Sequence, residues 1–144
     1  MNRLEFFNKC LDTQYESLDQ VNWNDRSLYT QPHSIGFLIE FANELNWDLV
    51  AEWTVIPQKY VMKFKNYMNW NKYITHHSPL PELMLEIVTK IDNIDWNIIS
   101  EKCWVVHTFV KSYYKKLNKD LFLNNKNVDN DVKMLYLSLM LENK

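Results

Sequence analysis

Glycine is nearly absent from this chain. One Gly occurs among the 144 residues, where average usage would give about ten. The phosphate-binding loops GxGxxG and GxxxxGK(S/T) each need at least two glycines, so a single one excludes both. The deficit also disfavours a β-sandwich or β-barrel, whose tight turns rely on glycine. The sequence therefore points away from nucleotide binding by these loops and away from an all-β fold.

Cysteine, unbalanced charge and long apolar runs are also scarce. Cys10 and Cys103 fit no CxxC pattern, and we expect two reduced thiols. A disulfide would need their Cα atoms within about 7 Å, which spacing does not decide. No run approaches the roughly 18 apolar residues of a membrane span, and the N-terminal residues lack the features of a signal peptide. Reduced thiols, together with the lack of a signal peptide and of a membrane span, indicate a cytoplasmic protein that binds no membrane. The formal net charge of −2 argues against a strongly basic nucleic-acid binder.

Tryptophan, in contrast, is frequent and regularly placed. Four of the six tryptophans lie between two Asn or Asp residues and follow an apolar residue. These frames are Asn22-Trp23-Asn24, Asn46-Trp47-Asp48, Asn69-Trp70-Asn71 and Asp95-Trp96-Asn97. Their tryptophans are 24, 23 and 26 residues apart, and a fifth frame, Asn118-Lys119-Asp120, has Lys in place of Trp. The spacing predicts an internal repeat with a period of about 23–26 residues.

Each repeat also carries an apolar set spaced as one face of an α-helix, at i, i+1, i+4 and i+8 or close to it. In chain order the sets are Phe37, Leu38, Phe41, Leu45; Tyr60, Val61, Phe64, Met68; Met84, Leu85, Val88, Ile91; Phe109, Val110, Tyr113, Leu117; and Val132, Lys133, Tyr136, Met140. The Asn or Asp that opens a frame is expected to cap a short first helix. Pro57 and Pro81 suit the start of a second helix of about eleven residues. One repeat is therefore predicted to be a pair of helices.

A helix pair this short cannot bury its apolar face alone, so such pairs are expected to stack in series. We predict an all-α fold, a small solenoid-like stack of helix pairs that forms a single domain over residues 1–144. Residues 1–21 are expected to form an N-terminal capping helix. Residues 22–45, 46–68, 69–94 and 95–117 form the repeats, and residues 118–144 form a degenerate C-terminal capping repeat.

Two local features complete the structural prediction. The asparagine-rich segment 124–130 is expected to be the loosest part of the chain. Gly36 falls inside the second helix of the first repeat, where glycine costs about 1 kcal/mol relative to alanine. A close approach by the neighbouring helix would explain this glycine, so we expect a bulky replacement of Gly36 to destabilise the fold.

The repeat resembles the short units, Asp/Asn-Trp-x-x-Ile-Ser followed by Leu-Ser-Glu-x-Phe-Ile-x-x-Phe, of proteins from large DNA viruses and some phages. The similarity covers residues 21–140 and is clearest at residues 46–51 and 95–100, whereas no repeat here has an intact Leu-Ser-Glu. The resemblance implies an α-helical repeat protein of viral origin, located in the host cytoplasm. It implies no catalytic activity and no cofactor.

Catalytic and metal-binding signals are weak. A metal site would need further ligands beside His76 and His77, which are expected in a turn, and no HExxH motif occurs. His107 follows Cys103 by four residues, so the two could touch on a helix, but no protease-like context surrounds them. A small metal-dependent or Cys/His hydrolase is therefore the weakest alternative, and we predict a non-enzyme without catalytic or metal-binding residues.

Nucleic-acid binding is a second alternative. Exposed lysines interleaved with tyrosines on the predicted second helices are typical of a groove for a nucleic-acid backbone, although solvated helix faces look the same. The candidate residues are Lys59, Lys63, Lys111 and Lys115.

Partner binding is the function that the pattern favours most. Large residues that vary between repeats lie six positions after each frame Trp, and repeat proteins bind partners through such variable positions. Packing between stacked helix pairs is the competing explanation for the same residues. The predicted surface comprises Tyr29, Trp53, His76 or His77, Lys102 and the nearby Trp104. We predict a protein–protein interaction module whose partner is another protein, such as a host factor or defence component, and in which exposed end faces could also support a homo-oligomer.

Overall fold

A computed structural model describes residues 1–143 of the chain and confirms the all-α prediction, since no β-strand occurs in this part. Its contacts divide the chain into two compact units, Met1–Asn69 and Trp70–Lys144. Within the described residues, none of the helices combines the length and apolarity that a membrane span requires. The prediction of a single domain stays a prediction.

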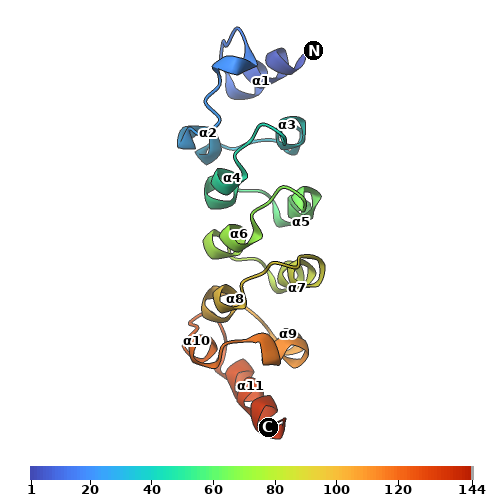
Figure 1. Ribbon diagram of the computed structural model, residues 1–144, viewed down its shortest axis with the longest axis vertical. Coiled ribbons are helices and arrows are strands. Elements are labelled where there is room, and N and C mark those ends of the chain that lie inside the picture. The colour runs from blue at the N-terminus through green and yellow to red at the C-terminus, as the bar shows by residue number, and fades with distance from the viewer. Residues whose placement is uncertain (144) are drawn as a thin grey trace. The chain divides into compact units, whose positions relative to one another are not determined.

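The N-terminal unit is built from short helices arranged in two columns. Its elements are α1 (Arg3–Leu11), η1 (Leu18–Gln20), α2 (Arg26–Thr30), α3 (Ile35–Glu40), α4 (Trp47–Trp53), α5 (Gln58–Val61) and η2 (Met62–Phe64). Within this unit, α2 lies over α4 in one column, and α3 lies over α5 in the other (Figure 1). Helix α1 packs on α3 and covers the end of that second column.

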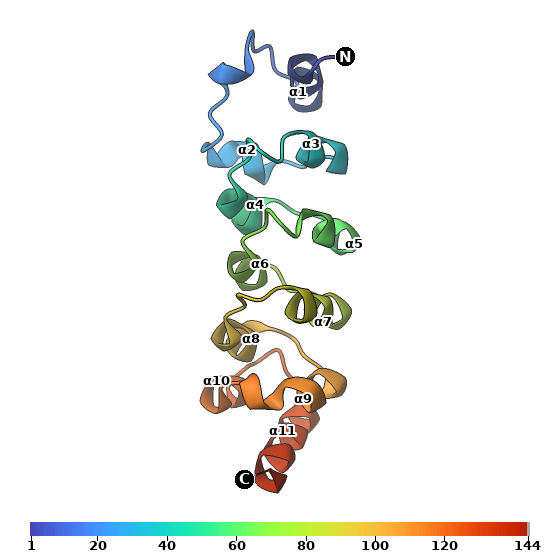
Figure 2. The same cartoon turned by 45° about the vertical axis from the view of Figure 1, so that its right-hand side comes forward.

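The C-terminal unit repeats this arrangement. Its elements are α6 (Trp70–His76), α7 (Pro81–Lys90), α8 (Trp96–Lys102), α9 (His107–Tyr113), η3 (Tyr114–Lys116), α10 (Lys119–Leu123) and α11 (Asn130–Glu142). Within this unit, α6, α8 and α10 form the column of first helices, and α7 and α9 form the column of second helices (Figure 2). Helix α11 packs on α9 and η3.

The residues that open the frames cap the first helices, as the sequence predicts. The Asn46 side chain accepts hydrogen bonds from the backbone N–H groups of Asp48 and Leu49. Asp95 caps α8 in the same way, and Asn118 caps α10. These side chains satisfy N–H groups that have no partner inside a helix.

The first repeat departs from this rule. Helix α2 begins at Arg26 and is capped by Asp25, whose carboxylate accepts from the Ser27 N–H at 3.0 Å. The frame Asn22-Trp23-Asn24 therefore lies before the helix instead of at its start.

The frames also tie successive first helices together. The backbone N–H of Asn46 donates to the Tyr29 hydroxyl at 2.8 Å, and the amide of Asn46 donates to Asn24 Oδ1 at 2.9 Å. In the C-terminal unit, the Asn118 N–H donates to Ser100 Oγ at 2.9 Å. A frame residue thus caps its own helix and bonds to the preceding helix pair.

In three repeats, the frame tryptophan packs on the second helix of its own pair. The Trp23 ring centroid lies 5.8 Å from that of Phe41. The corresponding distances are 5.3 Å for Trp47 and Phe64 and 5.4 Å for Trp96 and Tyr113. These aromatic contacts hold the two short helices of a pair side by side.

The apolar sets form most of the core, but Met140 of the fifth set is 37% exposed and the third set needs a correction. The first set is fully buried, from Phe37 to Leu45. In the third repeat, Leu85 is 44% exposed, whereas Leu83, Met84 and Ile87 are buried. The predicted set therefore begins one residue too late, since Leu83, Met84, Ile87 and Ile91 restore the regular spacing. The second helices are also shorter than the predicted eleven residues in several repeats, such as Ile35–Glu40.

The N-terminal helix ends earlier than the 1–21 prediction. Helix α1 stops at Leu11 because Asp12 takes a left-handed conformation with φ of 53°. The Asn8 side chain holds the following turn, since its Oδ1 accepts from the Tyr15 N–H at 3.0 Å and from the Thr13 hydroxyl at 2.9 Å. The segment beyond Leu11 is therefore a structured turn.

The segment 124–130 is well ordered, so the prediction of a loose segment is wrong. Asn125 is 1% exposed, and its amide donates to the carbonyl oxygens of Ser100 and Cys103 at 2.9 Å. Asn127 donates to the Lys102 carbonyl at 2.8 Å. Asn125 and Asn127 thus satisfy carbonyl groups at the end of α8, which explains the asparagines at these two positions.

The close approach expected at Gly36 is absent. A Cβ placed on Gly36 would lie 3.9 Å from Ser34 Oγ and 4.0 Å from the Phe6 ring, which is ordinary van der Waals contact. Gly36→Ala is therefore expected to raise the free energy of unfolding by roughly 0.5–1 kcal/mol, because alanine loses less backbone entropy in a helix. Urea denaturation of the two proteins measures the difference. A lower stability of the variant would contradict this account.

His33 gives the fold a pH dependence. Its ring stacks on Phe37 with centroids 4.5 Å apart and bonds to the Leu28 carbonyl oxygen. Burial lowers the pKa of His33 below its ordinary value of 6.5, against a smaller opposing effect of the Leu28 bond. In the unfolded chain, His33 becomes protonated below about pH 6.5, whereas in the folded chain its protonation requires a lower pH. The free energy of unfolding therefore falls as the pH falls below about 6.5.

The variant His33→Gln is expected to lose the part of the pH dependence of stability that comes from His33. We expect the drop in the free energy of unfolding between pH 7.5 and pH 5.5 to be smaller in His33→Gln than in the wild type. His76→Gln, which changes an exposed histidine, is the matched control and should follow the wild type. Equal pH dependence in all three proteins would show that His33 titrates alike in the folded and unfolded chains.

Candidate partner-binding surface

The structure separates the predicted surface residues by exposure. Tyr29 is 1% exposed, and its hydroxyl donates to the Trp23 carbonyl oxygen and accepts from the Asn46 N–H. Desolvation raises the pKa of Tyr29, with a smaller opposing effect of the Asn46 bond. Tyr29 therefore belongs to the core, and the packing explanation holds at this position.

Trp53 lies at the C-terminal end of α4 in the N-terminal unit. Its side chain is 41% exposed, and the Arg26 guanidinium carbon lies 4.9 Å above its ring centroid. This geometry is that of a cation–π contact. We call these two residues the Arg26–Trp53 pair.

Trp104 follows the end of α8 in the C-terminal unit and is 43% exposed. It lines a cavity of about 350 Å³ together with Ser78, Lys102, Asn127 and Asp129, and these five residues are called the Trp104 hollow. Trp104 and Lys102 were predicted as surface residues, and the structure brings them into one cavity. The cavity combines an aromatic ring with one cationic and one anionic side chain.

The two histidines of the predicted surface lie at the end of α6. His76 is exposed, whereas the His77 ring stacks on Tyr73 with centroids 4.7 Å apart. Neither lines the Trp104 hollow, although Ser78, the next residue, does. Among residues 1–143, no group of three or more His, Cys, Asp and Glu side chains is placed to hold a metal ion.

Sequence reasoning missed three members of the Trp104 hollow. Ser78, Asn127 and Asp129 come from a turn and from the loop before α11, away from the six-residue spacing that pointed to Lys102. Their only sequence signal is their position near the end of a first helix. That position is known only after the helix boundaries are known.

The Cys/His alternative finds little support in the geometry. Cys103 is buried, and burial raises the pKa of its thiol to about 12. The His107 ring does not bond to this thiol, and its Nε2 lies 3.3 Å from Asp131 Oδ2. A thiol in this state is a poor nucleophile at neutral pH, because the thiolate is the reactive form.

The lysines of the nucleic-acid alternative are exposed but fall into separate units. Lys59 and Lys63 lie on α5 and η2, and Lys111 and Lys115 lie on α9 and η3. Lys59 and Lys115 each lie near a tyrosine ring that is their immediate neighbour in the sequence, at 5.0 Å from Tyr60 and 5.9 Å from Tyr114. These are local contacts of solvated helices.

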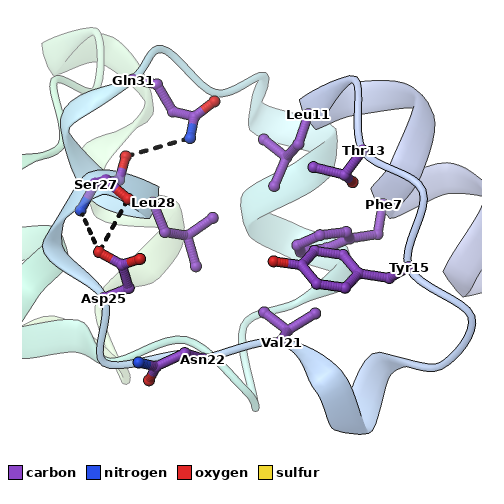
Figure 3. Close-up of a pocket in the computed structure, with 10 residues that line it drawn as sticks. All are labelled: Phe7, Leu11, Thr13, Tyr15, Val21, Asn22, Asp25, Ser27, Leu28 and Gln31. Carbon is purple, nitrogen blue, oxygen red and sulfur yellow. Dashed lines mark hydrogen bonds between the residues drawn. The ribbon is translucent and has the colours of Figure 1, made fainter.

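A second cavity lies in the N-terminal unit, and Figure 3 shows its lining. Phe7 and Tyr15 face Leu28 across a volume of about 180 Å³. On its rim, the Asp25 carboxylate is already paired, since it accepts from the N–H and hydroxyl of Ser27. The cavity lies between the N-terminal segment and α2, and the Tyr15 hydroxyl points into it (Figure 3).

The fold and this surface define the class of protein: an all-α protein built from short, stacked helix pairs with exposed tryptophans at the ends of two first helices. Comparisons with protein-family models, with curated proteins and with solved structures found no match.

The cysteines provide a direct test of the burial that disfavours thiol chemistry. At pH 7.5, iodoacetamide is expected to alkylate Cys10, which is exposed, and to leave Cys103 unmodified. Intact-mass measurement should therefore show one adduct on the native chain and two in urea. Cys10→Ser should show none before unfolding. Alkylation of both thiols at equal rates in the native protein would contradict the burial of Cys103.

Proposed function

We propose that this chain is a non-enzymatic protein–protein interaction module that binds another protein through the Trp104 hollow and the Arg26–Trp53 pair. The observation that carries the proposal is the exposure of Trp104 in a cavity lined by charged and polar side chains. Tryptophans that remain two-fifths exposed beside a cavity are typical anchors of protein interfaces. The resemblance to viral tryptophan repeats supports a viral protein that binds a host factor or defence component in the host cytoplasm.

The geometry supports a binding role more than a catalytic one. The best candidate nucleophile is buried with a raised pKa, and the cavity that contains charged groups has no histidine or cysteine in its lining. Nucleic-acid binding has less support, because the formal net charge is −2 and the ring contacts of Lys59 and Lys115 are with the tyrosines next to them in the sequence. The Trp104 hollow is therefore the site that we propose to test first.

The experiment compares quantitative capture of partner proteins from host-cell extract by four variants. Trp104→Ala and Trp53→Ala remove the proposed anchors. Leu85→Ala and Ile39→Ala remove apolar side chains of similar or greater exposure on second helices of the same units, and they serve as matched controls. Loss of a central anchor costs about 2 kcal/mol or more, which corresponds to a roughly 30-fold loss of affinity.

We expect at least one captured protein to be lost with Trp104→Ala and retained with Leu85→Ala, with circular dichroism confirming that both variants are folded. Capture that does not distinguish the tryptophan variants from their controls would refute the proposal. A gel shift at low salt that Lys63→Glu with Lys115→Glu abolishes would instead favour the nucleic-acid alternative.

A further inference from the structure

Trp53 and Trp104 are equally exposed but differ in what lies over their rings. The Arg26 guanidinium covers one face of Trp53 at 4.9 Å. No Arg or Lys of residues 1–143 lies over the ring of Trp104. Within the chain, Trp53 therefore already has a cationic partner in Arg26, whereas the ring of Trp104 can accept a cation from a partner protein.

Asp129 is the acidic residue of the Trp104 hollow. Asp129 occupies the N-cap position of α11, where an aspartate normally accepts a backbone N–H through its side chain. Here its side chain makes no such bond, and only its carbonyl oxygen accepts, from the N–H groups of Val132 and Lys133. Asp95, in the same position on α8, uses its carboxylate for capping at 2.9 Å. Asp129 instead lines the hollow together with Trp104.

We infer that the Trp104 hollow receives an arginine side chain of the partner protein, an inference that rests on the proposed function. A guanidinium is planar and carries five N–H donors, so it stacks on an indole ring and donates to a carboxylate at the same time. A lysine ammonium can also lie over an indole ring, as Lys116 does over Trp96 at 5.3 Å, but it is a point charge without the planar fork that pairs with a carboxylate in two parallel hydrogen bonds. The Arg26–Trp53 pair shows a guanidinium over an indole ring within the chain itself.

Lys102 indicates which residue should lie beside the arginine in the partner protein. It lines the same hollow, and among residues 1–143 it has no ion-pair partner. Its ammonium group would repel an incoming guanidinium unless the partner also supplies an acid. A segment that carries an arginine beside a glutamate or aspartate neutralises Lys102 and Asp129 together.

The test uses nuclear magnetic resonance of the ¹⁵N-labelled full chain. The probe is the capped dipeptide acetyl-Arg-Glu-amide, and the readout is the indole N–H signal of Trp104, assigned with Trp104→Phe. The matched probe replaces arginine by citrulline, which has the same shape without the charge. We expect a saturable shift of the Trp104 signal with the arginine probe, at least tenfold weaker binding of the citrulline probe, and no shift of the Trp53 signal.

Variants separate the roles of the charges. Asp129→Asn keeps a side chain that can cap α11, and it should weaken the arginine probe at least tenfold. Asp92→Asn changes an exposed acid outside the hollow and should have no effect. Lys102→Gln should remove the preference for acetyl-Arg-Glu-amide over acetyl-Arg-Gln-amide.

An unmoved Trp104 signal, equal binding of the citrulline probe, or equal effects of Asp129→Asn and Asp92→Asn would each overturn the inference. Partner capture distinguishes this failure from that of the proposed function. If capture still depends on Trp104 while the arginine probe fails, the interaction module stands and only its ligand is wrong. If capture also ignores Trp104, the proposed function falls as well.

Discussion

The structure depends on the hydrogen bonds that Asn and Asp side chains make at the start of the first helices. The frame residues Asn46, Asp95 and Asn118 make them for α4, α8 and α10, and Asp25 makes them for α2. Helices of five to seven residues, such as α2, α4, α8 and α10, are unstable alone in water because nucleation costs more than so few bonds return. The frame residues Asn46 and Asn118 satisfy orphan N–H groups of their own helix and donate their backbone N–H to the preceding helix pair. The frames therefore stabilise each helix and fix its position on its neighbour at the same time.

Aromatic packing between the two helices of a pair is the second interaction that stabilises the fold. Trp47 and Trp96 join the first helix of a pair to the second through Phe64 and Tyr113. The C-terminal ends of the first helices differ more between repeats. Tyr29 near the end of α2 is buried, whereas Trp53 and Trp104 lie exposed at or just beyond the ends of α4 and α8. The hollow that contains Trp104 is built from such ends.

The single glycine fits this arrangement. Turns between helices are made by side chains, such as the Asn8 amide after α1 and the Asn125 amide after α10, instead of by glycine in a left-handed conformation. The one left-handed residue in the described part of the chain is Asp12. Side-chain hydrogen bonds also explain why an asparagine-rich segment is ordered here, because its amides replace water as partners of buried carbonyl groups.

The amino-acid sequence by itself determined the repeat, the helix pairs and most of the core, because these depend on local capping chemistry and on helical spacing within a few residues. It failed where neighbouring elements decide. The core set of the third repeat is displaced by one residue from its predicted position, since helical spacing alone accommodated Leu85 as well as Leu83. Tyr29 and Trp53 occupy equivalent sequence positions, and only packing buries one and exposes the other. The Trp104 hollow unites Ser78, Lys102 and Asp129 from three separate segments, and the capping bond that Asp129 does not make leaves no trace in the sequence. Such a site exists only once the backbone has brought these segments together.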